Sequence, residues 1–128
     1  MDMQAWLRQV AVNLATQWGL DQSFASKAAL LLAYLYHYKL RPTITSGWRS
    51  PEKQTELMAR YNAGDPSIVA KPALKSRHLN SVLSRPASLA IDISTSDPLM
   101  AARIAVALGI RAGYFFSPPD PVHFDTGS

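Results

Sequence analysis

The sequence is most informative first in what it lacks. It contains no cysteine, which excludes a disulfide scaffold, a cysteine nucleophile, a thiolate zinc site and an iron–sulfur cluster. It has only three histidines and nine acidic residues. Any metal site must therefore be built from a small set of His, Asp and Glu side chains. Long apolar runs are also missing, since the longest, from Ala28 to Tyr36, falls well short of the about 18 residues of a membrane span. We expect no membrane-spanning segment.

Acidic residues are outnumbered by thirteen Lys and Arg, which gives a formal net charge of +4 at pH 7. The basic residues are scattered singly and do not alternate with aromatic ones. Nucleic acid is therefore not the expected partner, whereas an anionic cell wall is compatible with the charge. The start of the chain, with an acid at Asp2 and a polar interruption at Arg8, does not match a secretory signal peptide. We expect a protein that carries no export signal of its own.

The chain has 128 residues, of which 48% are hydrophobic, enough for a single domain over residues 1–128. Apolar spacing and capping residues predict helices over residues 3–18, 22–38, 51–62 and 98–108. Ser50 and Asp97 are the expected N-caps of the last two helices. Short strands are expected at 43–45, 89–93, 114–116 and 122–124, and an irregular stretch at 63–87. Helices combined with short strands joined by tight turns indicate an α+β domain.

Three polar residues in apolar surroundings are candidates for chemistry. His78, Asp92 and His123 together offer two imidazoles and one carboxylate, a set that suits a catalytic zinc ion. Strand alternation places Asp92 on the face opposite Ile91 and Ile93, so from the pattern alone it is either a solvated acid or a ligand. Asp120, held between prolines three residues before His123, is a candidate general base. From the residues alone, purely structural roles for this set stay open.

Four motifs occur in an order that resembles a known enzyme family. The pattern is similar to that of the zinc D-Ala-D-Ala carboxypeptidases and L-alanyl-D-glutamate endopeptidases, which include phage endolysins and share their fold with the hedgehog signalling domain. The motifs are Ser46-Gly47-Trp48-Arg49-Ser50, Ser76-Arg77-His78, Ala90-Ile91-Asp92 and Asp120-Pro121-Val122-His123. The resemblance implies a small antiparallel sheet with helices packed on it. It also implies a peptidase core over residues 30–125, preceded by a helical N-terminal extension over residues 1–29.

The resemblance also implies a role for each matching residue. His78, Asp92 and His123 would bind one zinc ion per chain. Asp120 would be the catalytic base, and Arg49 would bind substrate or stabilise the oxyanion. Ser76 would contact the substrate, although without the family a hydroxyl capping a nearby backbone group is the simpler interpretation.

One departure separates this chain from the family. His78 and Asp92 are fourteen residues apart, where the family has seven, and the extra residues affect the expected substrate more than the expected metal site. The expected function is a monomeric zinc peptidase that cuts peptidoglycan stem peptides, at an L-Ala–D-Glu or a D-Ala–D-Ala bond. It would be made in the cytoplasm and would reach the wall through a phage holin, a virion or a secretion machine. The alternative is a non-catalytic wall-binding or virion structural module with the same fold.

Overall fold

The computed structural model describes residues 2–68, 72 and 76–126. Four helices and a four-stranded sheet make up most of it. The helices are α1 (Met3–Gln17), α2 (Gln22–His37), α3 (Pro51–Asn62) and α4 (Pro98–Ala107). The strands of the main sheet are β1 (Thr43–Ser46), β4 (Ala90–Ser94), β5 (Arg111–Ala112) and β6 (His123–Asp125). The α+β fold class expected from the sequence is therefore confirmed.

Side-chain caps fix where the helices begin. Ser50 accepts a hydrogen bond from the backbone N–H of Lys53, and Asp97 accepts one from that of Met100. Pro51 and Pro98 follow these caps and open α3 and α4, where a missing N–H carries no cost. Both N-caps expected from the sequence are confirmed. No helix among the described residues is long and apolar enough to span a membrane.

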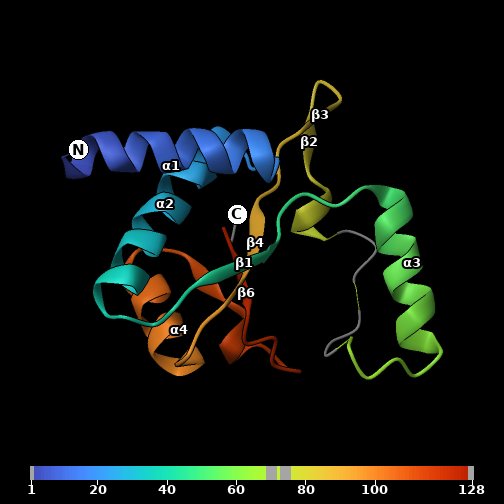
Figure 1. Ribbon diagram of the computed structural model, residues 1–128. Helices are drawn as coiled ribbons and strands as arrows, with labels where there is room; N and C mark the ends of the chain where they lie inside the picture. The colour runs from blue at the N-terminus through green and yellow to red at the C-terminus, as the bar shows by residue number, and fades with distance from the viewer. Residues whose placement is uncertain (1, 69–71, 73–75, 127–128) are drawn as a thin grey trace.

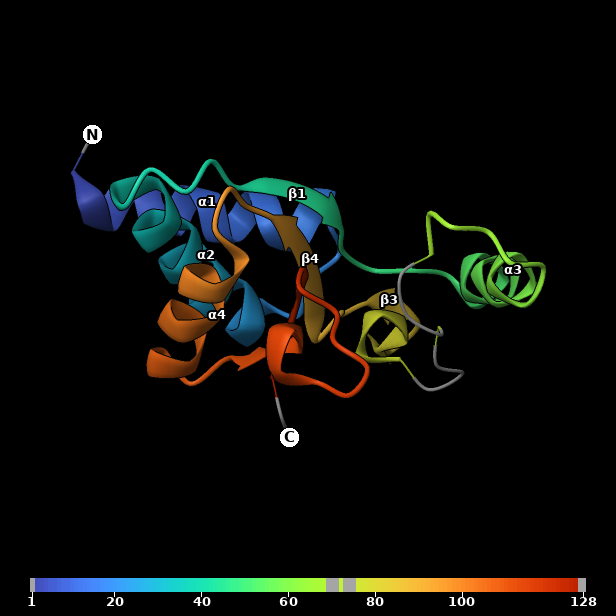
Figure 2. The ribbon, with the colours of Figure 1, turned by 90° about the horizontal axis from the view of Figure 1, so that it is seen from below.

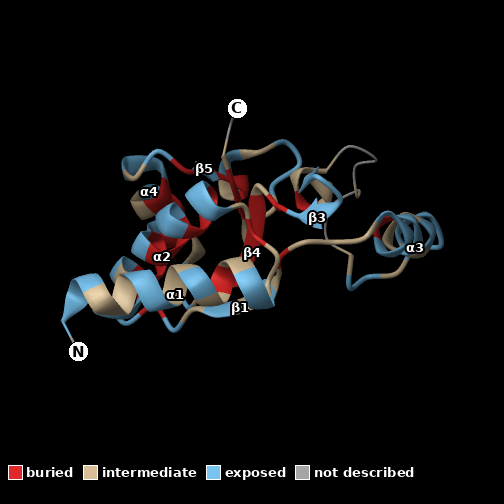
Figure 3. Cartoon of the chain, turned by 90° about the horizontal axis from the view of Figure 1, so that it is seen from above, coloured by how far each residue is buried: buried red, intermediate tan, exposed pale blue. Residues whose placement is uncertain are grey.

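The sheet has the order β1-β4-β6-β5, and each neighbouring pair is antiparallel. Helices α1, α2 and α4 gather on one side of it, and α3 lies apart on the other (Figures 1 and 2). Apolar residues of α1, α2, α4, β4 and β6 form one core cluster. Burial is concentrated in the sheet and the facing sides of α2 and α4, whereas α3 is largely exposed (Figure 3). The expected boundary between the N-terminal extension (1–29) and the peptidase core (30–125) falls inside α2. Residues of α2 on both sides of this boundary belong to the same core cluster.

Two expectations for the local structure are wrong. The strand expected at 114–116 is instead a 3-10 turn, η2 (Gly113–Phe115), and the edge strand β5 comes just before it. The stretch expected to be irregular contains another 3-10 turn, η1 (Arg77–Leu79), and a hairpin of β2 (Ser81–Val82) and β3 (Arg85–Pro86). Residues 69–71 and 73–75 of that stretch lie outside the described residues.

Strand β4 is the centre of the sheet and carries Asp92. It pairs with β1 on one side and with β6 on the other, and four of its five residues, Ala90 to Ile93, are buried. Alternation in the sequence suggested one apolar and one polar face. Both faces are in fact covered, so Asp92 is buried and is not a solvated acid.

Candidate metal centre

Three segments bring His78, Asp92 and His123 together. The antiparallel register places Asp92 of β4 directly opposite His123 of β6. His78 reaches the same point from η1, where Ser76 caps the turn by accepting the backbone N–H of His78. Asp92 Oδ1 lies 3.2 Å from His78 Nε2 and 3.3 Å from His123 Nδ1. One ligand atom from each residue lies within 4.8 Å of the others.

The outer nitrogen of each imidazole is already occupied. His78 Nδ1 lies 2.7 Å from the carbonyl oxygen of Gly47, and His123 Nε2 lies 2.7 Å from Asp125 Oδ2. Both partners are acceptors, so the outer nitrogens carry the protons. When both rings are neutral, their inner nitrogens therefore present lone pairs to the carboxylate of Asp92. Three acceptors that face one another need a metal ion or a shared proton between them, and tying the outer nitrogen in this way is typical of metal-binding histidines.

Charge in the site follows from these contacts. Burial raises the pKa of Asp92, but hydrogen bonds and charges from His123 and His78 outweigh it and hold the pKa well below its usual range. Burial lowers the pKa of His123, but Asp125 and Asp92 outweigh it and raise the pKa to about 9. Without a metal ion, a proton on His123 thus supplies positive charge that the cluster needs. Two imidazoles and one carboxylate fit a zinc ion with an open coordination position.

Arg49 lies behind the second oxygen of Asp92. Its Nη2 donates to Asp92 Oδ2 at 2.9 Å, and its Nε donates to Ser46 Oγ at 3.1 Å. Gln54 of α3 accepts from Nη1 at 3.4 Å. The guanidinium therefore binds one oxygen of Asp92 and leaves Oδ1 facing the two imidazoles. Beside Arg49 lies a cleft of about 390 Å³, whose lining includes Ser46, Trp48 and Lys53.

Asp120 is held next to the cluster by its backbone. Its N–H donates to the carbonyl of Gly113, and its own carbonyl accepts the N–H of His123. Burial and the negative charge of Asp92 raise the pKa of Asp120, against the positive charges of His123, Arg49 and His78. Its half-buried side chain thus lies within electrostatic reach of the whole site, without belonging to the three-residue group.

Sequence analysis missed two residues that hold the site in place. Asp125 is buried and binds His123, and Gly47 supplies the carbonyl for His78. Asp125 was detectable in principle, because an acid two residues after His123 in a strand lies on the same face. Gly47 acts only through its backbone, and no side-chain pattern could have pointed to it.

The comparisons with known proteins support the fold. No family model matches the chain, and no curated protein sequence is similar to it. Solved structures that are similar to the chain include two peptidases. One is the vancomycin resistance D,D-pentapeptidase VanY of the VanB-type resistance cassette, a mutant in complex with Zn(II), with a TM-score of 0.60 and 20% identity over 85% of this chain and 73% of that chain. The other is the L-Ala D-Glu endopeptidase ChiX of Serratia marcescens, with a TM-score of 0.55 and 19% identity over 98% of this chain and 90% of that chain.

The chain has the fold of these peptidases. The TM-scores of 0.60 and 0.55 therefore confirm the fold expected from the resemblance in the sequence. The fourteen-residue separation of His78 and Asp92 does not disturb it. The added residues fold outward as the β2–β3 hairpin, and both residues still meet at 3.2 Å.

Proposed function

We propose that this protein is a zinc-dependent peptidase that hydrolyses an amide bond in peptidoglycan stem peptides, of the L-Ala–D-Glu or D-Ala–D-Ala type. The carrying observation is the convergence of His78 Nε2, Asp92 Oδ1 and His123 Nδ1, with both outer imidazole nitrogens already tied. These three residues would hold one zinc ion. The zinc-bound VanY structure and the ChiX structure support this assignment through their shared fold.

The chain's own residues supply the remaining chemistry in this proposal. When bound, zinc polarises a carbonyl and lowers the pKa of a water to about 7. Asp120 takes a proton from the attacking water as the bond from oxygen to the carbonyl carbon forms. It then gives that proton to the nitrogen as the carbon–nitrogen bond breaks. Arg49 and Ser76 contact the peptide, and the cleft beside Arg49 offers a place for part of the chain that is cut.

The proposed place of action is the bacterial cell wall. The net charge of +4 at pH 7 favours an anionic wall. In this proposal the protein acts as a monomer, after release by a phage holin, delivery in a virion or transport by a secretion machine.

The first test measures bound metal by elemental analysis, together with the products of a purified peptidoglycan digest by mass spectrometry. We expect near one zinc per chain in the wild type and little in His123→Ala. Asp120→Asn should keep the zinc and lose about 100- to 10,000-fold in turnover, the usual contribution of a general acid–base. Glu52→Gln, on the exposed face of α3, is the matched control and should leave both unchanged.

Each failure has a distinct meaning. A wild type that takes up no zinc after zinc is supplied contradicts the proposal. A wild type that holds zinc but releases no stem-peptide fragment is a wall-binding or structural module instead. The masses of the fragments identify the bond.

A further inference from the structure

Four side chains, His123, Asp125, Arg111 and Phe116, contact one another in a closed cycle. His123 Nε2 donates to Asp125 Oδ2 at 2.7 Å. Arg111 donates to both oxygens of Asp125, from Nε at 2.8 Å and from Nη2 at 3.0 Å. The guanidinium of Arg111 lies 4.8 Å from the centre of the Phe116 ring, and that ring lies 5.7 Å from the ring of His123. The last of these contacts leads back to His123, so the cycle is closed.

Asp125 is the buried member of this group, whereas the Arg111 side chain is 52% exposed. Asp125 is 1% exposed, and a buried carboxylate is costly unless it is paired and hydrogen-bonded. The forked Arg111 guanidinium binds it at two points, a geometry that fixes direction as well as charge. Arg77 adds positive charge 3.9 Å from Oδ2.

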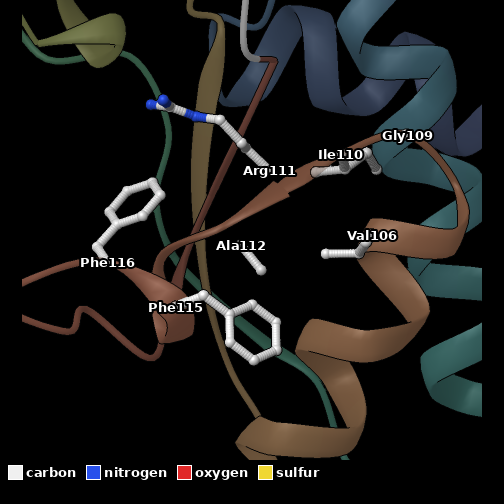
Figure 4. Close-up of a pocket in the computed structure, with 7 residues that line it drawn as sticks. All are labelled: Val106, Gly109, Ile110, Arg111, Ala112, Phe115 and Phe116. Carbon is white, nitrogen blue, oxygen red and sulfur yellow. The ribbon is translucent and has the colours of Figure 1, made fainter.

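Among the residues that the structure describes, Asp125 is the ion-pair partner of Arg111. Arg111 and Phe116 also line a cavity of about 470 Å³, together with apolar residues and a glycine (Figure 4). Arg111 is the one charged residue in that lining. No acidic side chain in that lining competes with Asp125 for the charge of Arg111.

We propose that Asp125, held by Arg111, is a positioning residue for the metal centre, and that Phe116 sets the tilt of the same imidazole. The carboxylate of Asp125 accepts a hydrogen bond from His123 Nε2 at 2.7 Å, which keeps a proton on Nε2 and leaves Nδ1 as the nitrogen that faces Asp92 Oδ1. The inference rests on the proposed function, because it assigns His123 to a metal ion. It adds the residues that prepare His123 before the metal binds.

A purely structural role makes a different prediction. Arg111 and Asp125 are cross-strand partners in the β5–β6 pair, so their ion pair could serve only to hold the edge strand. In that case its loss would lower the free energy of unfolding without changing zinc affinity in the folded protein. Zinc affinity, measured by chelator competition on folded protein, therefore separates the two roles.

The experiment compares three variants with the full-length wild type. Asp125→Asn should weaken zinc binding about 10- to 100-fold, the usual effect of removing an outer partner of a metal-binding histidine. Asp125→Asn combined with Arg111→Gln removes both charges together, so that no unpaired charge is buried, and should show a similar loss. Asp65→Asn is the matched control. It breaks a 2.8 Å Arg60–Asp65 ion pair of the same type outside the site and should leave the zinc affinity unchanged.

A second readout does not depend on metal. In the wild type the Nε2–H proton of His123 should give a downfield NMR signal that is protected from solvent exchange. It should lose that protection in both Asp125 variants. Folded Asp125 variants that keep zinc affinity within about threefold of the wild type, well inside the usual loss, would overturn this inference alone. A wild type that binds no zinc would overturn the proposed function as well.

Discussion

At the scale of single residues, Gly113 is required by the close approach of the chain that carries the site. A Cβ built on Gly113 would lie 2.3 Å from the carbonyl oxygen of Asp120 and 2.9 Å from His123 Cβ. We expect the methyl group of Gly113→Ala to push Asp120 and His123 away from residue 113 and so to weaken zinc binding. The free energy of unfolding should fall by about 1–3 kcal/mol, as overpacking usually causes. Thermal unfolding and zinc titration check both effects.

The control for this substitution is Ser117→Ala, an exposed position in the same connection. It should leave the melting temperature and the zinc affinity as they are. A Gly113→Ala variant with wild-type zinc affinity would show that the spacing of Asp120 and His123 is not set by this contact.

How far the sequence predicts the site depends on what each residue does. Four short motifs in a recognisable order allowed His78, Asp92 and His123 to be predicted as the residues that hold a metal. These three side chains do meet in the structure. Arg49 was expected at the substrate and contacts Asp92 in the structure. Such pairings follow from strand register and three-dimensional approach. The pairing of Arg111 with Asp125 is an example, because β5 has only two residues and gives no strand pattern in the sequence.

At the scale of elements, predictions succeeded where local chemistry decides the structure. The Ser50-Pro51 and Asp97-Pro98 pairs mark helix starts directly. Tyr114 and Phe115 have high strand propensity, but that propensity depends on the packing around a residue. In the structure both residues lie in the 3-10 turn η2. The β2–β3 hairpin gave no signal because its turn uses Leu83 and Ser84 at φ values of 50° and 63°, where glycine or asparagine is the usual marker.

The hairpin should be separable from the metal centre. Ala87 N–H donates to the carbonyl of Asn80, and Asn80 Nδ2 donates to the carbonyl of Ala87, so the chain is already closed at the base of the hairpin. We expect replacement of residues 81–86 by a short glycine link to leave zinc affinity within about threefold, because loop length changes closure entropy only slightly. The preferred peptide substrate should change, since Ser81 contacts Trp48 of the cleft.

Leu83→Gly is the control that keeps the hairpin. Leu83 is 92% exposed and has positive φ, so glycine there loses no packing and relieves strain. This variant should keep both zinc affinity and substrate preference. A deletion that abolishes zinc binding, while the Leu83→Gly variant keeps it, would show that the hairpin helps to hold His78.

At the scale of the whole molecule, a metal ion would join parts of the fold that the apolar core joins less directly. The core cluster contains residues of α1, α2, α4, β4, β5 and β6, whereas η1 with His78 is outside it. Zinc would connect η1 to β4 and β6 through His78, Asp92 and His123. We expect free zinc at about 100 times its dissociation constant to add about 2.7 kcal/mol of stability. For a domain of this size that raises the melting temperature by about 10 °C, measured by calorimetry with and without a chelator.

The size of this shift depends on which residues bind the ion. His123→Ala should melt at the same temperature with and without zinc, because one of the three ligands is gone. His37→Ala is the matched control, since His37 is exposed at the end of α2, and it should keep the full wild-type shift. If zinc stabilises His123→Ala as much as the wild type, the ion binds elsewhere on the chain, and the convergence of His78, Asp92 and His123 is then a buried ion-pair network that links η1 to the sheet without metal.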